Sequence, residues 1–418
     1  MRILMLAQFY PPVIGGEERH VRNLGQALLR RGHQVVVATI WQNGLAPYEV
    51  DEGVEVHRLR GTMQRLDVLF SDRDRKYAPP LPDPELVSGL HRVTRRHNPD
   101  IVHAHNWLLH SYLPLKRSVG AGFVVTLHDL SLSCLQKNTM RHGDPCTGPA
   151  FGKCLGCALD FYGPIKGPVA ALGGWTSGAI ERRRVDRFLA VSSAIAVGNR
   201  LAEKGLPFEV VPNFVADDVG LLREGDTRIE QLPAEDFLLY VGDLRIQKGI
   251  LVLLQAYEAL RDAPPLVLIG RRCPDTPRDL PKNVFVFESW PHQCVMHAWK
   301  RCLFGIAPSI LPDACASVVI EAMALGKPMI VSEVGGMPDL VDDGRTGILV
   351  PKGNVSALAD AMRRLIDRPE LRASMGDSAK LKSEHFKAGS VVPRIERIYR
   401  NLAAKTSPRP ELMHETSG

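Results

Sequence analysis

The sequence predicts an α/β protein with two doubly wound domains that face each other across a central cleft. Its 418 residues are too many for one ordinary hydrophobic core and fit two. Short apolar, β-branched runs alternate with longer segments whose apolar residues recur with a period near 3.6. This alternation is typical of βαβ units around a parallel sheet, and it starts afresh in the second half of the chain.

The first half of the chain contains seven strand-like runs. The helical segment EERHVRNLGQALLRRG (17–32) follows the first of them. We expect residues 1–215 to form the first domain. The predicted strands are RILMLAQF (2–9), QVVVATI (34–40), VEVHRL (54–59), DIVHAH (100–105), GFVVTLHD (122–129), RFLAVSS (187–193) and FEVVPN (208–213).

A second set of elements follows the polar stretch 217–236, which lacks a clear period and suits a linker region. We expect residues 216–387 to form the second domain. A helix at about 388–404 would cross back onto the first domain, and the tail 405–418 has the composition of a disordered end. The predicted strands are DFLLYVGDL (236–244), PLVLIG (265–270), NVFVFES (283–289), FGIAPS (304–309), PMIVSEV (328–334) and TGILV (346–350). The predicted helices are KGILVLLQAYEAL (248–260), SVVIEAMAL (317–325) and SALADAMRRLI (356–366).

The amino-acid composition limits the class of protein. Hydrophobic residues make up 45% and charged residues 23%, as in soluble globular proteins, and no apolar run reaches the length of a membrane span. The start MRILMLAQFYPPV reads as a first strand and not as a signal peptide, so we expect a cytoplasmic protein.

The positive charge lies in the first half. Residues 1–215 carry 26 Lys and Arg against 19 Asp and Glu, whereas the remainder carries 26 against 27. The clusters ERRRVDR (181–187) and HRVTRRH (91–97) are each typical of a solvated helix face. Together they permit weak attraction to an anionic acceptor or to the inner face of a membrane, and no nucleic-acid partner is expected.

Polar residues and glycines follow several of the predicted strands, where open α/β sheets bind ligands. Gly15 and Gly16 come between the first strand and its helix, where glycine lets the backbone approach a phosphate or a sugar, although a simple tight turn explains them as well. His105 ends a strand, and His128 ends the next one. Each is either a buried histidine with satisfied hydrogen bonds or a partner for a substrate hydroxyl.

The first strand of the second domain ends at Gly242, and a helix begins near Lys248. A lysine at this position can pair with a diphosphate, and Arg245 can add to it. The alternative is a surface lysine, which is less expected at a helix start because the helix dipole disfavours a cation there.

The stretch PDACASVVIEAMALGKP (312–328) predicts a short helix, with Ser317 as N-cap and Gly326 and Pro328 as the stop. Asp313 would precede the helix, and Glu321 would lie about one turn inside it. A helix N-terminus offers N–H groups and partial positive charge to an anion. A solvated Glu321 and a turn-forming Asp313 are the plainer alternative.

The combination of these motifs, together with VSS, VPN and VGGMPDLVDDGRTGILV (334–350), resembles glycosyltransferase family 4. The resemblance runs from about residue 1 to 385 and is most specific over 305–351. It implies the GT-B fold, which has two Rossmann-like domains, and a retaining transfer from a nucleotide-activated sugar. It further implies that the first domain mainly receives the acceptor and that the second binds the donor.

The resemblance also assigns roles to residues. Glu321 matches the glutamate that holds the ribose hydroxyls, and Asp313 matches the carboxylate that contacts the donor sugar. Lys248 matches the lysine that neutralises the diphosphate. Positions that line the donor and the active site are Gly15 and Gly16 of the glycine-rich loop, Gly242, Ser317 and Val318 at the helix N-terminus, and the active-site histidine His105.

Two departures from the family pattern bear on catalysis. The chain has Asp313 where the family usually has glutamate, and Ala316 where it has glycine. The phosphate-binding arginine that often follows VG is Asp243 here. Either Arg245 replaces that arginine, or Lys248 and the helix N-terminus carry more of the leaving-group stabilisation.

The resemblance, together with these residues, implies a retaining transfer from a UDP- or GDP-sugar to a saccharide or lipid-linked acceptor, with no cofactor or catalytic metal. Two alternatives stay open. One is a sugar-nucleotide epimerase of the same fold. The other is a non-catalytic nucleotide-sugar-binding protein, which the aspartate at 243 suggests.

Four of the eight cysteines fall within residues 134–157, namely Cys134, Cys146, Cys154 and Cys157, and the last two form a CxxC pair. In a cytosolic chain such a cluster is more often metal-binding than disulfide-bonded. The spacing is compatible with a structural Zn²⁺ that holds a long loop, and free thiols are the alternative.

Overall fold

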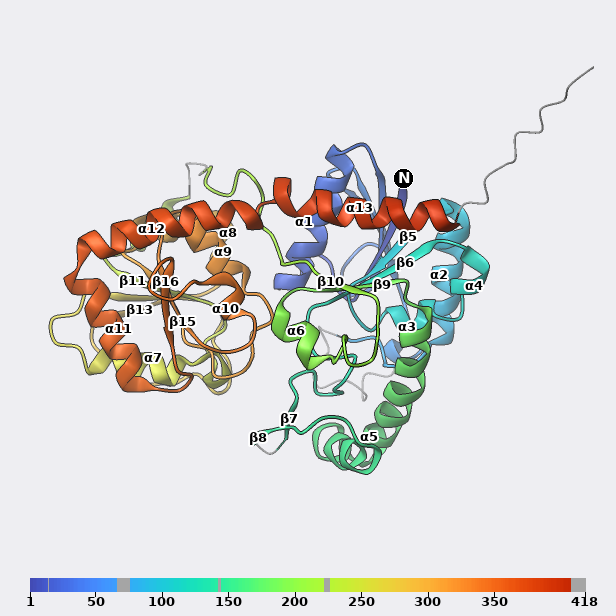
Figure 1. The fold of residues 1–418 in the computed structure, drawn as a ribbon, viewed down its shortest axis with the longest axis horizontal. Coiled ribbons are helices and arrows are strands. Elements are labelled where there is room, and N and C mark those ends of the chain that lie inside the picture. The colour runs from blue at the N-terminus through green and yellow to red at the C-terminus, as the bar shows by residue number, and fades with distance from the viewer. Residues whose placement is uncertain (14, 66–75, 142–143, 222–225, 407–418) are drawn as a thin grey trace, which may run out of the picture.

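The chain folds around two separate parallel sheets, which form two lobes (Figure 1). The computed structural model describes residues 1–13, 15–65, 76–141, 144–221 and 226–406. The first sheet has eight strands in the order β10-β9-β6-β5-β1-β2-β4-β3 and the second has six in the order β13-β12-β11-β14-β15-β16. Two doubly wound α/β lobes confirm the predicted fold class.

All seven strands predicted for the first half are present. They are β1 (Arg2–Ala7), β2 (Gln34–Ile40), β4 (Val54–Leu59), β5 (Ile101–Ala104), β6 (Gly122–Leu127), β9 (Arg187–Ala190) and β10 (Phe208–Val210). An eighth, β3 (Tyr48–Asp51), pairs antiparallel with β4. This edge hairpin, whose turn places Glu52 and Gly53 at positive φ, was not predicted.

Helices of the first lobe follow its strands. The helix after β1, α1 (Gly16–Arg30), agrees with the prediction, whereas the long, kinked α5 was not predicted. The other helices are α2 (Pro84–His97), α3 (Leu109–Tyr112), α4 (Lys116–Val119) and α6 (Ser193–Gly198), with the short η1 (Met63–Arg65). Helix α5 (Phe151–Arg184) bends at Gly163, where φ is 81°, and its glycines and prolines hide the usual helical period. A two-stranded ribbon, β7 (Met140–Arg141) and β8 (Asp144–Pro145), precedes it.

All six strands predicted for the second half are present and parallel. They are β11 (Leu238–Val241), β12 (Leu266–Ile269), β13 (Val284–Phe287), β14 (Gly305–Ala307), β15 (Met329–Ser332) and β16 (Gly347–Val350). The helices are α7 (Ile250–Glu258), α8 (His292–Arg301), α9 (Ser317–Ala324), α10 (Met337–Leu340), α11 (Val355–Asp367) and α12 (Pro369–Ser383). Short 3-10 turns are η3 (Thr227–Gln231), η4 (Ile246–Lys248) and η5 (Glu384–Phe386).

The last helix returns to the first lobe. Helix α13 (Ala388–Thr406) buries Val391, Ile395 and Tyr399 in the same apolar cluster as β1 and α1. The chain passes between the lobes at two adjacent points, because Val215 N–H donates to the carbonyl of Phe386 and Val215 accepts from the N–H of Ala388. Residues 407–418 of the expected disordered tail, and 222–225 of the expected linker, lie outside the described residues. No helix among the described residues is long and apolar enough to cross a membrane.

Candidate active site

Helix α9 and the loop before it form the centre of the site, as the sequence predicts. Asp313 lies in the loop, and Glu321 lies just over one turn inside the helix. The prediction of Ser317 as N-cap is wrong, because the cap is Ala316 and no side chain caps the helix. The Ser317 hydroxyl instead faces the first lobe, where a Cβ placed on Gly16 would lie 3.9 Å from its Oγ. The N-terminus of α1 therefore meets the N-terminus of α9, and both present partial positive charge to the same space.

The loop at Asp313 is held by the two glycines after β15. A Cβ on Gly335 would lie 2.3 Å from the carbonyl oxygen of Asp313, and one on Gly336 would lie 2.1 Å from that of Ala314. The N–H of Gly336 donates to the Asp313 carbonyl at 2.7 Å. Gly336 also packs against Ser192 of the first lobe, where an added Cβ would come within 2.7 Å. Only glycine allows this approach, so VGG fixes both the loop and the contact between lobes.

Glu321 carries a charge in a buried position. Its Oε1 accepts from Arg19 Nη1 at 3.1 Å and bonds His292 Nε2 at 2.9 Å. Burial raises the pKa of Glu321, but the hydrogen bond to His292 and the charges of His292 and Arg19 outweigh burial and leave that pKa below its ordinary value. The second oxygen, Oε2, is buried and has no hydrogen-bond partner. A buried carboxylate oxygen without a partner is unfavourable, so this atom is suited to accept a hydrogen bond from a ligand.

A cavity of about 530 Å³ lies beside Glu321, between the lobes. Gly16, Arg19 and His20 of α1 contribute one wall, and His292, Ser317 and Glu321 contribute the other. The volume suits a small-molecule ligand. The lobes are further joined at this interface by the Asn213 side-chain amide, which donates to the Cys315 carbonyl at 2.9 Å.

Lys248 lies between β11 and α7, as the sequence predicts. Its Nζ pairs with Oδ2 of Asp313. Its backbone is fixed by the next residue, because Gly249 has φ 81° and a Cβ there would lie 1.8 Å from the Pro308 carbonyl. Gly249 therefore cannot be replaced by a residue with a side chain without moving the loop that carries Lys248.

Arg245 lies three residues before Lys248 and is closest to a different carboxylate. Its Nε is 3.7 Å from Asp275, whereas Asp243 pairs with Arg271 at 2.9 Å. Gly242 directly follows β11 and has φ 151°, and its carbonyl lies against Gly270. The cation that balances Asp243 is thus Arg271, which the sequence analysis did not name, and a phosphate contact by Arg245 stays a prediction.

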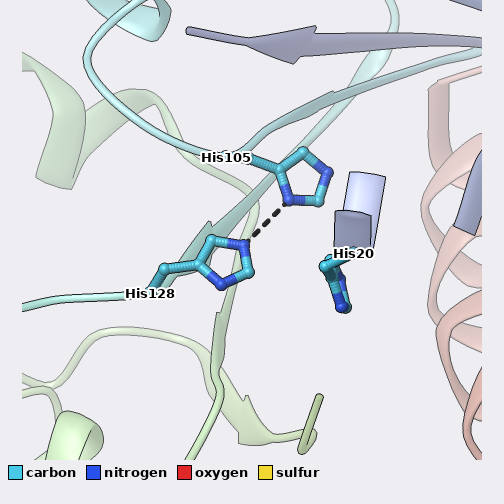
Figure 2. Close-up of side chains that lie close together, drawn as sticks. All are labelled: His20, His105 and His128. Carbon is cyan, nitrogen blue, oxygen red and sulfur yellow. Dashed lines mark hydrogen bonds between the residues drawn. The ribbon is translucent and has the colours of Figure 1, made fainter. Parts of the chain in front are cut away.

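Three histidines converge at the carboxyl ends of β5 and β6 (Figure 2). His105 Nδ1 and His128 Nε2 are 3.1 Å apart, and the ring of His20, from α1, lies within 5.6 Å of both rings. Burial lowers the pKa of all three, that of His128 to about 3, so the imidazoles are neutral at pH 7. His105 Nε2 and His20 Nδ1 are buried without a partner.

Such a cluster can serve a polar ligand in two ways. Neutral imidazoles hydrogen-bond hydroxyl groups, and their candidate ligand atoms lie within 4.8 Å of one another, as a metal site would require. The neighbouring His103 has a different role, because its two nitrogens bond Tyr399 at 2.5 Å and Thr126 at 2.7 Å. His103 is therefore a satisfied core residue that ties α13 to the first sheet.

The four clustered cysteines line one cavity of about 330 Å³, and none of them forms a disulfide. They belong to neither of the two groups, among the described residues, whose ligand atoms converge within 4.8 Å. Burial raises the pKa of Cys157, and the three other thiols add to that rise. The four therefore share one pocket without taking up metal-binding geometry.

Three residues that line the cavity, Arg19, His20 and His292, were not predicted from the sequence. Arg19 and His20 lie three and four positions after Gly16, on the first two turns of α1, and this spacing was visible in the sequence. His292 begins α8 and meets Glu321 only through the packing of α8 on α9. No spacing in the sequence relates these two residues.

Comparison with known proteins agrees with the geometry. Residues 14–219 match the model described as Glycosyltransferase Family 4, and residues 225–382 match Glycosyl transferases group 1. A glycogen synthase of Mycobacterium tuberculosis is 26% identical, over 99% of this chain and 98% of the relative. An N-acetyl-alpha-D-glucosaminyl L-malate synthase of Bacillus anthracis is 24% identical, over 93% and 94%.

Solved structures share the fold over nearly the full length. Sucrose-phosphate synthase from Thermosynechococcus elongatus superposes with a TM-score of 0.75 at 20% identity, covering 97% of this chain and 99% of that one. HepE from Anabaena, in complex with UDP-glucose, gives a TM-score of 0.65 at 17% identity, covering 96% and 100%. With family models matching both halves and the GT-B arrangement of lobes, the chain belongs to glycosyltransferase family 4, whose members are retaining glycosyltransferases.

Proposed function

We propose that this protein transfers a sugar from a UDP- or GDP-sugar to a saccharide or lipid-linked saccharide acceptor. The observation that carries the proposal is the partnerless Oε2 of Glu321, buried beside a cavity between the lobes. A carboxylate in this position suits the paired hydroxyls of a ribose, and the two opposed helix N-termini suit a diphosphate.

The proposed chemistry uses charge that is already in place. Breaking the sugar–phosphate bond leaves a diphosphate, whose negative charge is stabilised by Lys248 and by the N–H groups of the first turn of α9, including Ser317 and Val318. The N-terminus of α1 at Gly15 and Gly16 adds to that field. With these groups stabilising the leaving diphosphate, the proposed reaction needs no catalytic metal.

Donor binding would rearrange one ion pair. Lys248 is paired with Asp313. A diphosphate competes for the lysine and so releases the Asp313 carboxylate to accept hydrogen bonds from the hydroxyls of the donor sugar. Aspartate is one methylene shorter than the glutamate usual in the family, so the sugar would lie closer to the loop.

His105 would act on the transferred sugar. Its neutral ring has one buried nitrogen without a partner, and His128 holds the ring through the other nitrogen. Neutral imidazole can bond a sugar hydroxyl without attracting the diphosphate away from Lys248. We assign the acceptor to the side of the first lobe, residues 1–215, and the donor to the second, residues 216–387.

Two observations bear on the alternatives. An epimerase would need no acceptor, and family membership favours transfer. A non-catalytic binder was suggested by the aspartate at 243, but Arg271 neutralises this residue. Slow hydrolysis of a donor in the absence of an acceptor, if it is lost in Lys248→Ala, would support a catalytic function. Epimerised donor, or binding without turnover in the presence of acceptors, would contradict it.

The base and the sugar are best found by a thermal-shift panel of nucleotide sugars, because a ligand that binds only the folded state raises the melting temperature. UDP- and GDP-sugars are the expected hits. An ADP-sugar belongs in the panel because a starch synthase of the same fold, with a TM-score of 0.66, is bound to ADP. If no UDP-, GDP- or ADP-sugar raised the melting temperature, the donor assignment would be contradicted.

We also propose a structural metal at the four clustered cysteines. Its support is that all four line one cavity at the start of α5 and that none is in a disulfide. A bound Zn²⁺ would draw the thiolates together and hold the loop between β6 and α5.

A further inference from the structure

Helix α5 exposes its large apolar side chains and buries its small ones. Beyond the bend at Gly163, one series of exposed positions is Ile165, Val169, Leu172, Thr176, Ile180 and Arg183. Their spacing of three or four residues places them on one face. About 80% of Ile165, 61% of Leu172 and 50% of Val169 is accessible. A helix packed onto a water-soluble core normally has the opposite arrangement.

Close packing explains why glycine and alanine make up most of the buried face, which also contains Ser177 and Glu181. A Cβ on Gly167 would lie 2.7 Å from the carbonyl of Ala158 in the first arm of α5. A Cβ on Gly173 would lie 3.0 Å from the carbonyl of Pro80. The inner face therefore excludes large residues, but nothing in this packing requires large apolar residues on the outer face.

Aromatic residues extend the outer face across the bend. Phe151 and Trp175 are exposed and meet edge to face, with ring centroids 5.6 Å apart, and Phe161 is exposed as well. We call this surface of Phe151, Phe161, Ile165, Val169, Leu172 and Trp175 the α5 face. It lies on the first lobe, and Figure 1 shows α5 at the lower edge of the molecule, away from the six-stranded sheet.

We propose that the α5 face binds the surface of an anionic phospholipid bilayer. Apolar side chains enter the boundary between headgroups and acyl chains, and tryptophan is favoured at that depth. Cations border the apolar stripe, with Lys153 near Phe151 and with Arg182, Arg183 and Arg184 at the end of the helix. Arg183 is exposed on the same face as Ile165, eighteen residues or five helical turns away.

Charge complementarity favours lipid over a second copy of this chain. Segment 151–184 has five Lys and Arg and only two acidic residues, and burial raises the pKa of one of these, Glu181, to about 8. A twofold dimer through this face would bring like charges together, whereas an anionic headgroup layer neutralises them. This inference goes beyond sugar transfer and gives a defined surface to the membrane attraction expected from charge.

Flotation of the full-length protein with vesicles tests the proposal. We expect the protein to float with phosphatidylcholine vesicles that contain phosphatidylglycerol and much less with phosphatidylcholine alone. The double variant Ile165→Gln/Leu172→Gln should bind on the order of tenfold more weakly, because membrane binding scales with buried apolar area. Leu381→Gln, at a residue that is 74% exposed on α12, is the matched control and should float like the wild type.

Three outcomes would overturn the proposal. The double variant could float like the wild type, which would leave charge alone as the cause. The wild type could fail to float. The wild type could elute as a dimer that the double variant dissociates, which would identify a protein partner. A blue shift of tryptophan emission with vesicles, lost in Trp175→Phe, would support insertion. Thermal shift with nucleotide sugars should be unchanged in these variants, so failure here and failure of the proposed transfer are separate results.

Discussion

Lys248 and Asp313, the residues proposed to contact the diphosphate and the donor sugar, form an ion pair with each other. The two residues come from different loops, after β11 and after β14, and 65 positions separate them. If one contacts the diphosphate and the other the sugar, as we propose, donor binding must separate this ion pair.

Lys248→Ala should lower kcat about 100- to 1,000-fold, because it removes a cation from the leaving group. Asp313→Asn should also lose most transfer but should keep its affinity for the nucleoside diphosphate. Steady-state kinetics together with calorimetric titration of UDP or GDP separates the two effects. Full transfer activity in Asp313→Asn would contradict its assignment to the sugar.

Glu321→Gln should bind the nucleoside diphosphate about tenfold or more weakly, because the neutral amide is a poorer acceptor for ribose hydroxyls. A sharper measurement uses the 2′,3′-dideoxy analogue. The wild type should bind it more weakly than the ordinary nucleotide, whereas Glu321→Gln should no longer distinguish the two. Glu384→Gln, at an exposed position in η5, is the control. An unchanged preference in Glu321→Gln would remove the ribose assignment.

The buried histidines should make folding sensitive to acid. Their pKa values are lowered in the folded protein, that of His128 to about 3, against about 6.5 in the unfolded chain. The unfolded state therefore binds more protons between these values, so stability is present above pH 6.5 and falls as the pH drops toward 3.

Urea unfolding at pH 7 and pH 5 measures this effect. One such histidine contributes up to about 1.4 kcal/mol per pH unit within that window. The loss of free energy of unfolding on acidification should be smaller in His128→Gln than in the wild type. It should be unchanged in His385→Gln, which alters an exposed histidine. Equal losses in all three proteins would show that His128 does not titrate as proposed.

Gly336→Ala should destabilise the protein by about 1–3 kcal/mol and weaken donor binding, because the added methyl would overlap the Ala314 carbonyl and Ser192. Gly152→Ala is the matched control, since a Cβ there meets no atom within 4 Å. Thermal unfolding with and without the nucleotide reads both effects. If Gly336→Ala were as stable as the control, the loop that contains Asp313 and Ala314 would have to shift at no cost in stability.

The purified protein should contain about one zinc per chain if the cysteine cluster binds metal. Cys154→Ser/Cys157→Ser should lose the metal and lower the melting temperature, whereas Cys273→Ser, outside the cluster, should do neither. Elemental analysis of protein purified without chelators measures this. Absence of stoichiometric zinc or iron would leave four free thiols.

The elements of this fold were predictable because they depend on local patterns. Apolar runs such as RILMLA and LLYV and the period of GEERHVRNLGQALLR each specify their own structure, and so all thirteen expected strands are present. Helix α5 was missed for a local reason too, since its glycines, prolines and outward apolar residues break the period on which that prediction depends. The edge strand β3 was missed because YEVD is not an apolar run, and its residues are exposed or only partly buried.

The sequence by itself determined that Asp313, Lys248, Glu321 and His105 follow strands or begin helices, at the edge where parallel sheets bind ligands. Only the tertiary structure decided what these residues meet. Arg19 reaches Glu321 across 302 positions, and His20, His105 and His128 converge from one helix and two strand ends. Such contacts depend on strand order and on how the two lobes pack. Local periodicity carries no information about either, because residues far apart in sequence become neighbours only when both sheets have formed.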